Sequence, residues 1–171
     1  MIIIGYPGVG KSTLAESYVN GDRPNGFKSV IDLESSLFHG GCTGDPFRGG
    51  REVTNWAYTY CSVAMELSRQ GHIVFVSSHA DVQRYLRECT EQVRVVYPAI
   101  ELKQEWLERL RGRYICSWDN EKDKNFAAYN RACDHYEDDI EYLKSNGFEL
   151  MEITEMHYDL ADLVFGEQEA E

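Results

Sequence analysis

The sequence predicts a three-layer α/β/α sandwich built on a mostly five-stranded parallel sheet. Short apolar runs rich in β-branched residues alternate along the chain with segments whose apolar residues recur at helical spacing. A length of 171 residues, with 43% hydrophobic and 27% charged residues, is typical of one globular domain. We therefore expect a single domain over residues 1–171, without internal repeats.

Five segments are expected to form strands because they are short, apolar and bounded by glycine, proline or polar residues. They are residues 2–4, 29–32, 73–77, 93–97 and 148–153. Runs that are apolar throughout indicate strands buried on both faces, which is typical of a parallel sheet.

Apolar residues three and four positions apart predict helices between these strands. These helices are expected over residues 11–19, near 56–70, 82–89, 102–110, 126–143 and 160–165. Trp56 and Tyr60 lie on the stripe of the second helix, so we assign them to the core rather than to base stacking. The stripe that runs from Phe126 through Cys133 to Leu143 predicts a long helix packed on the sheet.

The composition argues against several classes of protein. The net charge of −12 arises entirely from residues 119–171, which hold 16 acidic and 4 basic residues. This balance disfavours a nucleic-acid partner, because such proteins usually present a basic face. There is no signal peptide pattern and no apolar run of the roughly 20 residues that a membrane span needs. The five cysteines are scattered, without a Cys-x-x-Cys pair, which favours a reduced, cytoplasmic location over a disulfide framework or metal site.

The most specific motif is Gly-Tyr-Pro-Gly-Val-Gly-Lys-Ser at residues 5–12, which fits G-x-x-x-x-G-K-[ST] in full. Its glycines allow backbone N–H groups to approach phosphate oxygens, Lys11 would reach the β- and γ-phosphates, and the Ser12 hydroxyl would ligate Mg²⁺. A chance match is disfavoured, since an apolar strand precedes the motif and a helix follows it. We expect ATP and Mg²⁺ to bind here. The residues expected to contact the nucleotide are Gly5, Pro7, Gly8, Val9, Gly10, Lys11, Ser12 and Thr13.

An acidic residue closes the second expected strand but not the third. The second reads Val-Ile-Asp-Leu-Glu, which makes Asp32 the candidate general base or second magnesium ligand. Its alternative is a carboxylate that caps the turn after the strand. Glu34 lies two residues further on and is a candidate to share the role at the acceptor. The third strand ends at Ser78 and His79, and His79 is a candidate acceptor contact or a helix cap.

This arrangement resembles the nucleoside monophosphate kinases and their relatives, the gluconate and shikimate kinases. Residues 73–87 are similar to a strand and helix of gluconate-kinase-like enzymes. Residues 95–98 and 106–113 are similar to the strand and arginine-bearing helix that lead into the kinase lid. In layout the chain is similar to small adenylate-kinase-like proteins of phages and Gram-positive bacteria. The resemblance implies a P-loop NTPase fold. The chain departs from these families in two ways: it lacks the lid of long adenylate kinases, and it lacks the acceptor signature D-G-x-P-R.

The resemblance also implies roles for arginines outside the phosphate loop. Residues 109–125 are the candidate lid, in which Arg109 and Arg113 are one helical turn apart and would neutralise the transferred phosphate. The alternative pairs Arg109 with Glu105, and position alone does not choose among Arg109, Arg111 and Arg113. Within the glycine-rich residues 35–55, the candidate acceptor-binding insert, Arg48 and Arg51 would clamp an acceptor phosphate or simply solvate the surface.

The leading hypothesis is an ATP-dependent kinase that transfers the γ-phosphate to a nucleoside or nucleotide. A polynucleotide or modified-base DNA kinase is the second hypothesis. A regulatory ATPase without a small-molecule acceptor is the third. The acceptor, the base preference and the oligomeric state stay open at this point.

Overall fold

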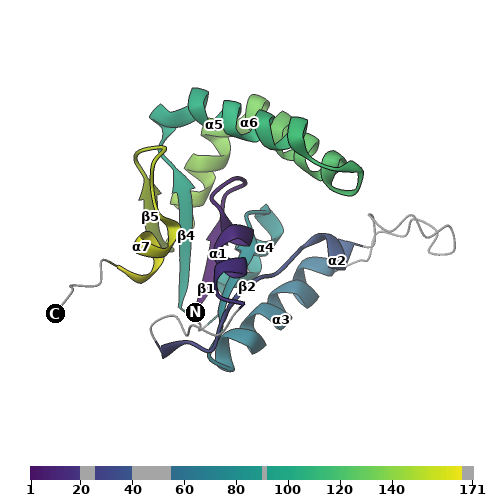
Figure 1. Cartoon of the computed structure of the whole chain (residues 1–171). Coiled ribbons are helices and arrows are strands. Elements are labelled where there is room, and N and C mark those ends of the chain that lie inside the picture. The colour runs from purple at the N-terminus through teal and green to yellow at the C-terminus, as the bar shows by residue number, and fades with distance from the viewer. Residues whose placement is uncertain (20–25, 40–54, 90–91, 167–171) are drawn as a thin grey trace, which may run out of the picture.

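The computed structural model describes residues 1–19, 26–39, 55–89 and 92–166 (Figure 1). Five strands pair side by side in the order β2-β3-β1-β4-β5, and every pair is parallel. The strands are β1 (Ile2–Gly5), β2 (Val30–Asp32), β3 (Ile73–Ser77), β4 (Val93–Pro98) and β5 (Glu149–Ile153). The prediction of an α/β protein with a five-stranded parallel sheet is confirmed.

Helices occupy most of the chain between the strands. They are α1 (Lys11–Ser17), α2 (Ser36–His39), α3 (Trp56–Arg69), α4 (Ala80–Arg87), α5 (Lys103–Cys116), α6 (Asp119–Ser145) and α7 (Leu160–Phe165), with a 3₁₀ turn at Ile100–Leu102. Helix α2 falls within the glycine-rich residues 35–55, where no helix was predicted. The rest of that segment, from residue 40 to residue 54, lies outside the described residues.

The strand order sets the layers. The connection from β1 to β2 runs toward one edge of the sheet, whereas the later connections run toward the other edge. Because parallel crossovers are right-handed, α1 covers one face, and α3, α4 and α6 belong to the opposite face. Helix α1 accordingly contacts α7, and α3 contacts α4 (Figure 1). The outcome is the predicted arrangement of helices on both faces of the sheet.

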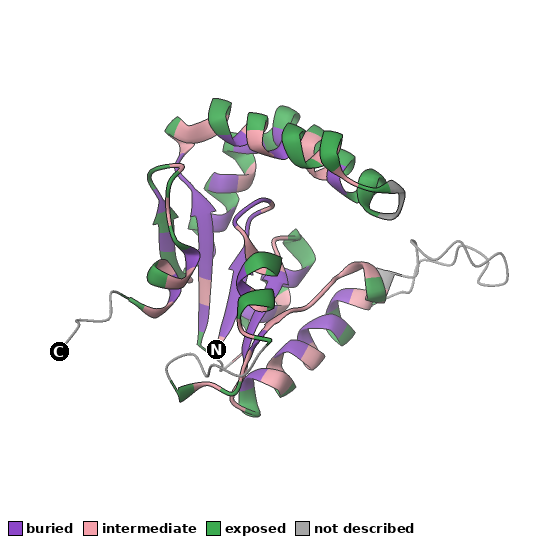
Figure 2. Cartoon of the chain, in the orientation of Figure 1, coloured by how far each residue is buried: buried purple, intermediate pink, exposed green. Residues whose placement is uncertain are grey.

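The core is centred on β1. Residues Ile2, Ile3 and Ile4 are fully buried, and so are Phe75 of β3 and Val95 of β4 beside them (Figure 2). A strand that is paired on both edges and covered on both faces has no contact with water, which explains why its sequence is apolar without alternation. This burial fixes the segment that follows β1 at the middle of the sheet edge.

Helix α6 follows the predicted apolar stripe only in its second half. Phe126 is 44% exposed and Cys133 is also exposed, whereas Ala132 and Tyr136 are buried. The helix packs along α5 and reaches β4 only in part, and it bends at His135, where φ is −134°. Before the bend the buried face is therefore one residue away from the predicted stripe, whereas beyond it Tyr136, Ile140 and Leu143 are buried as predicted.

Within the part of the chain that the structure describes, we find no helix whose length and apolar character would allow it to cross a bilayer.

Candidate functional site

The glycine-rich segment forms a tight loop between β1 and α1. It starts at the carboxyl end of the central strand, whose chain leaves toward the opposite face from both of its neighbours, β3 and β4. Such switch points are where open α/β sheets form a ligand crevice. Gly8 and Gly10 have φ values of 91° and 93°, which favour glycine. At Gly8 a Cβ atom would also lie 3.1 Å from Leu110 Cδ2 of α5.

Two aromatic side chains hold the carbonyl groups of this loop. Trp106 of α5 donates its indole N–H to the Pro7 carbonyl at 2.9 Å, and Tyr158 donates its hydroxyl to the Val9 carbonyl at 3.0 Å. In a trans peptide the next N–H points away from the carbonyl. The amides of Gly8 and Gly10 are therefore turned away from these two rings. Neither aromatic residue was among the candidates from the sequence, because no local pattern marks a side chain that acts on a distant loop.

Lys11 begins α1 and folds back over the loop. Its ammonium donates to the Gly5 carbonyl at 3.2 Å. Burial lowers the pKa of Lys11, the Asp32 carboxylate raises it in part, and the Arg113 guanidinium lowers it further. Two more charges, on Glu34 and Lys124, also act on the ammonium, so charged groups from β2, α5 and α6 surround it.

Ser12 and Asp32 come together at the ends of α1 and β2. The Ser12 hydroxyl donates to Asp32 Oδ2 at 2.6 Å, although the two residues are 20 positions apart in the sequence. A hydroxyl and a carboxylate are oxygen ligands of the kind that Mg²⁺ prefers. Among the described residues no group of three or more histidine, cysteine or acidic side chains could hold a metal ion. A magnesium ion here would therefore depend on phosphate oxygens and water for its other ligands, as is usual for that ion.

Glu34 is held by a residue that the sequence did not single out. Lys124 Nζ lies 2.7 Å from both carboxylate oxygens of Glu34, so the first turns of α6 are joined to the segment after β2. Both side chains are about 40% exposed, at 42% and 37%. Lys124 lies among acidic residues on a polar stretch, where a lysine gives no signal of a distant partner.

The arginines of α5 have different surroundings. The Arg109 guanidinium carbon is 5.2 Å from the centre of the Trp106 ring and 5.3 Å from that of Tyr158, beside the two donors to the loop. Arg113 donates to Asn125 Oδ1 of α6 at 3.2 Å. Arg111 is exposed. Arg109 thus lies beside the glycine-rich loop and contacts rings rather than Glu105, whereas Arg113 acts on Lys11 through its charge. That the two arginines face a transferred phosphate together stays a prediction.

The other candidate acceptor residues are placed as follows. His79 precedes α4, where its Nδ1 lies 2.8 Å from Ser77 Oγ and its ring packs edge-on against Trp56. Its side chain makes no capping hydrogen bond to the helix, which disfavours the capping role. Arg48 and Arg51 lie outside the described residues.

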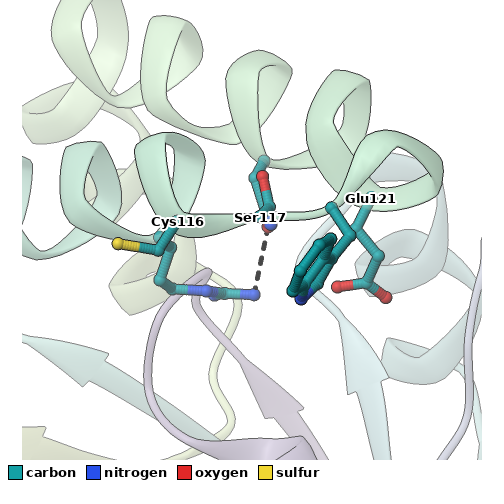
Figure 3. Close-up of a pocket in the computed structure, with 6 residues that line it drawn as sticks. Cys116, Ser117 and Glu121 are labelled. Atoms are coloured by element: carbon teal, nitrogen blue, oxygen red, sulfur yellow. Dashed lines mark hydrogen bonds between the residues drawn. The ribbon is translucent and has the colours of Figure 1, made fainter.

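A hollow of about 420 Å³ opens where α5 passes into α6 (Figure 3). It is lined by Arg113, Cys116, Ser117, Trp118, Glu121 and Asn125. Figure 3 shows Cys116 on α5 and Glu121 on α6 on either side of the connection at Ser117. In Figure 1 the paired helices α5 and α6 extend over the carboxyl ends of the strands, so the hollow belongs to the part of the molecule that covers the glycine-rich loop.

Comparison of the sequence with protein-family models and with curated proteins finds no match.

Proposed function

We propose that the chain binds ATP with Mg²⁺ through residues 5–13, as a P-loop NTPase, and transfers the γ-phosphate to a nucleoside or nucleotide. The support is the motif G-x-x-x-x-G-K-[ST] together with its setting at the switch point of a parallel sheet. The family resemblance supplies the class of acceptor.

The observation that carries the proposal is the contact between Ser12 and Asp32 at 2.6 Å beside Lys11. The motif by itself predicts a lysine and a hydroxyl at the triphosphate. It does not predict that a carboxylate from another strand meets the hydroxyl. A kinase needs all three, because transfer depends on charge neutralisation and on a group that orients the acceptor.

Each residue has a distinct role in this mechanism. The loop amides and Lys11 would bind the triphosphate, and Ser12 and Asp32 would hold the metal ion, which would neutralise charge on the phosphate oxygens. Asp32 also accepts a hydrogen bond from the attacking hydroxyl or orients the attacking phosphate. Arg109 and Arg113 approach from α5 and stabilise the charge that spreads over the transferred group.

The test is acceptor-dependent release of ADP across a panel of nucleosides, nucleoside monophosphates and sugars. Lys11→Ala should lower the rate with the best acceptor by roughly 100-fold or more, as expected when a main charge-stabilising group is lost. Lys103→Ala is the matched control, since that lysine pairs with Glu137 on the outside of α5 and α6. Full activity in Lys11→Ala would refute the mechanism. ATP turnover that no acceptor stimulates would support a regulatory ATPase instead.

A further inference from the structure

The connection between α5 and α6 exposes a large aromatic side chain. Trp118 is 86% exposed, the highest value among the large apolar side chains of the described residues. Its carbonyl accepts the N–H of Glu121 at 2.9 Å, and the neighbouring Ser117 hydroxyl donates to the Tyr114 carbonyl at 2.8 Å. These two hydrogen bonds hold the turn that carries the indole, and the ring is exposed to a ligand.

Polar groups of both kinds surround this ring. The hollow combines the Glu121 carboxylate, which can only accept hydrogen bonds when ionised, with the Arg113 guanidinium, which can only donate. Asn125 is only 5% exposed, and its Oδ1 accepts a hydrogen bond from Arg113, so any bond from Asn125 to a ligand would be donated by its NH₂. The hollow of about 420 Å³ is open to solvent, so a ligand could reach these groups directly.

An aromatic face edged by donors and an acceptor matches a nucleobase. Bases stack on tryptophan through their π faces, and their edges carry both amino groups and acceptor atoms. A sugar or sugar acid has no π face and packs on a tryptophan only through its C–H groups. The composition of the hollow therefore favours a base over the sugar acceptors used by the gluconate and shikimate kinases.

The hollow also lies beside the proposed transfer site. Arg113 lines the hollow, and its charge acts on Lys11. Lys124, next to Asn125 in the chain, binds Glu34 two residues after Asp32. If a base were bound at Trp118, the sugar and phosphate attached to it would extend toward the end of β2, where Asp32 contacts Ser12.

We infer that the hollow between α5 and α6 binds the base of the phosphoryl acceptor, with the base stacked on Trp118 and its edge bonded by Arg113, Glu121 and Asn125. The inference rests on the proposed function for the identity of the transferred group. It assigns base recognition to the α5–α6 connection rather than to residues 35–55, where the sequence suggested acceptor contacts.

The first experiment measures the dissociation constants of four nucleoside 5′-monophosphates and of ATP with Mg²⁺ by calorimetry. Trp118→Ala should weaken the binding of at least one monophosphate by roughly 5- to 150-fold, the contribution of one stacked base. The dissociation constant of ATP should change by no more than about twofold. Trp118→Phe should recover most of the affinity. Ile115→Ala is the matched control, since Ile115 is 61% exposed on α5 but does not line the hollow. Ribose 5-phosphate, which lacks a base, should bind equally to all variants.

Two cysteines give a second readout without mutation. Cys116 and Cys133 are both exposed, but only Cys116 lines the hollow. A bound monophosphate should slow alkylation of Cys116 by iodoacetamide and leave Cys133 unchanged, as followed by peptide mass spectrometry.

The outcomes separate the two proposals. If ATP binds but no monophosphate loses affinity in Trp118→Ala, or if monophosphates fail to protect Cys116, the base site is overturned and the phosphate loop stands. If ATP fails to bind the wild-type chain, the proposed function falls, and the base site falls with it.

Discussion

At the scale of single residues, the hydrogen bond from Tyr158 to the loop is the simplest to test. Tyr158→Phe keeps the ring that stacks on Trp106 and removes only the hydroxyl that holds the Val9 carbonyl. Without that bond the peptide between Val9 and Gly10 can rotate, and its amide loses its fixed direction. We expect ATP affinity to fall by roughly 2- to 10-fold, the value of one neutral hydrogen bond, as measured by calorimetry.

Tyr136→Phe is the control for that change. The Tyr136 hydroxyl donates to the Ala99 carbonyl at 2.9 Å, so the variant loses the same kind of bond at a place outside the glycine-rich loop. Both variants should lose a similar amount of unfolding free energy in urea, but only Tyr158→Phe should bind ATP more weakly. Equal ATP affinity in the two variants would show that the hydroxyl does not orient the loop.

Gly8 has two separate reasons to be glycine, and a second glycine allows them to be separated. Gly8→Ala and Gly26→Ala both place a side chain at positive φ, which costs about 1–2 kcal/mol. Only at Gly8 does the new Cβ atom meet Leu110 and Trp106, whereas Gly26 has nothing within 4 Å. Urea unfolding should show an additional loss of about 1–3 kcal/mol for Gly8→Ala. Equal losses of unfolding free energy in the two variants would mean that Leu110 and Trp106 can move away from the new Cβ atom without destabilising the fold.

The lowered pKa of Lys11 predicts how ATP binding depends on pH. A lysine carries its charge below its pKa, so a pKa held below the usual value by burial means that the charge is lost earlier as pH rises. ATP affinity should therefore decline at an alkaline pH where an ordinary lysine stays charged. Lys11→Arg should abolish this decline, because arginine stays protonated throughout that range. A wild-type affinity that is flat up to the usual pKa of lysine would contradict the prediction.

At the scale of elements, the pair between Lys124 and Glu34 ties the start of α6 to the end of β2. Partly exposed ion pairs contribute about 0–1 kcal/mol, so Lys124→Met should change global stability little. It should release the first turns of α6 locally, and their amides should exchange with deuterium up to about fivefold faster. High salt should have the same effect on the wild-type chain, since screening weakens the pair.

The pair between Lys103 and Glu137 provides the comparison. It joins α5 to the middle of α6 at 2.7 Å and has similar exposure. Lys103→Met should therefore leave exchange in the first turns of α6 as it is. If both substitutions speed exchange there equally, the pair with Glu34 has no special part in holding the helix.

Elements were predictable from the sequence where a single period was clear. The strand over residues 73–77 was predicted with the bounds that the structure gives, and β1 differs by one residue. Helix α2 was missed because one short turn after a strand has no period to detect. In α6 the neighbours Ala132 and Cys133 fit the spacing equally well, and only contact with α5 decides which one is buried.

At the scale of the whole molecule, Cys61 reports on unfolding. It is 1% exposed and donates to the Val82 carbonyl at 3.7 Å, and burial raises the pKa of its thiol to about 12. At pH 8 roughly 10⁻⁴ of such a thiol is thiolate, so the folded chain should resist alkylation at Cys61. As urea is increased, the alkylation rate of Cys61 should rise in step with global unfolding measured by circular dichroism. Cys116 should be alkylated already in native buffer. Equal native rates at both cysteines would contradict this burial.

The candidate site was predictable only for residues that belong to local patterns. The loop, Ser12 and Asp32 follow from a motif and from the end of a strand, and the fold brings the last two into contact. Trp106, Tyr158 and Lys124 reach the same region from positions 99, 149 and 90 residues beyond the residues they bind. Their part depends on how helices pack over the sheet, which no short stretch of sequence encodes. The same is true of the hollow at Trp118.

The position of β1 in the sheet also constrains how the protein is made. Ile2 has partners at Val74 and Val93, so β1 is synthesised long before either of the strands that pair with it. At about 5–20 residues per second, that delay is on the order of ten seconds. Throughout it, three consecutive isoleucines remain open to wrong pairing. Newborn chains are therefore most vulnerable to aggregation before β4 emerges, and chaperones that bind extended apolar segments should help most in that interval.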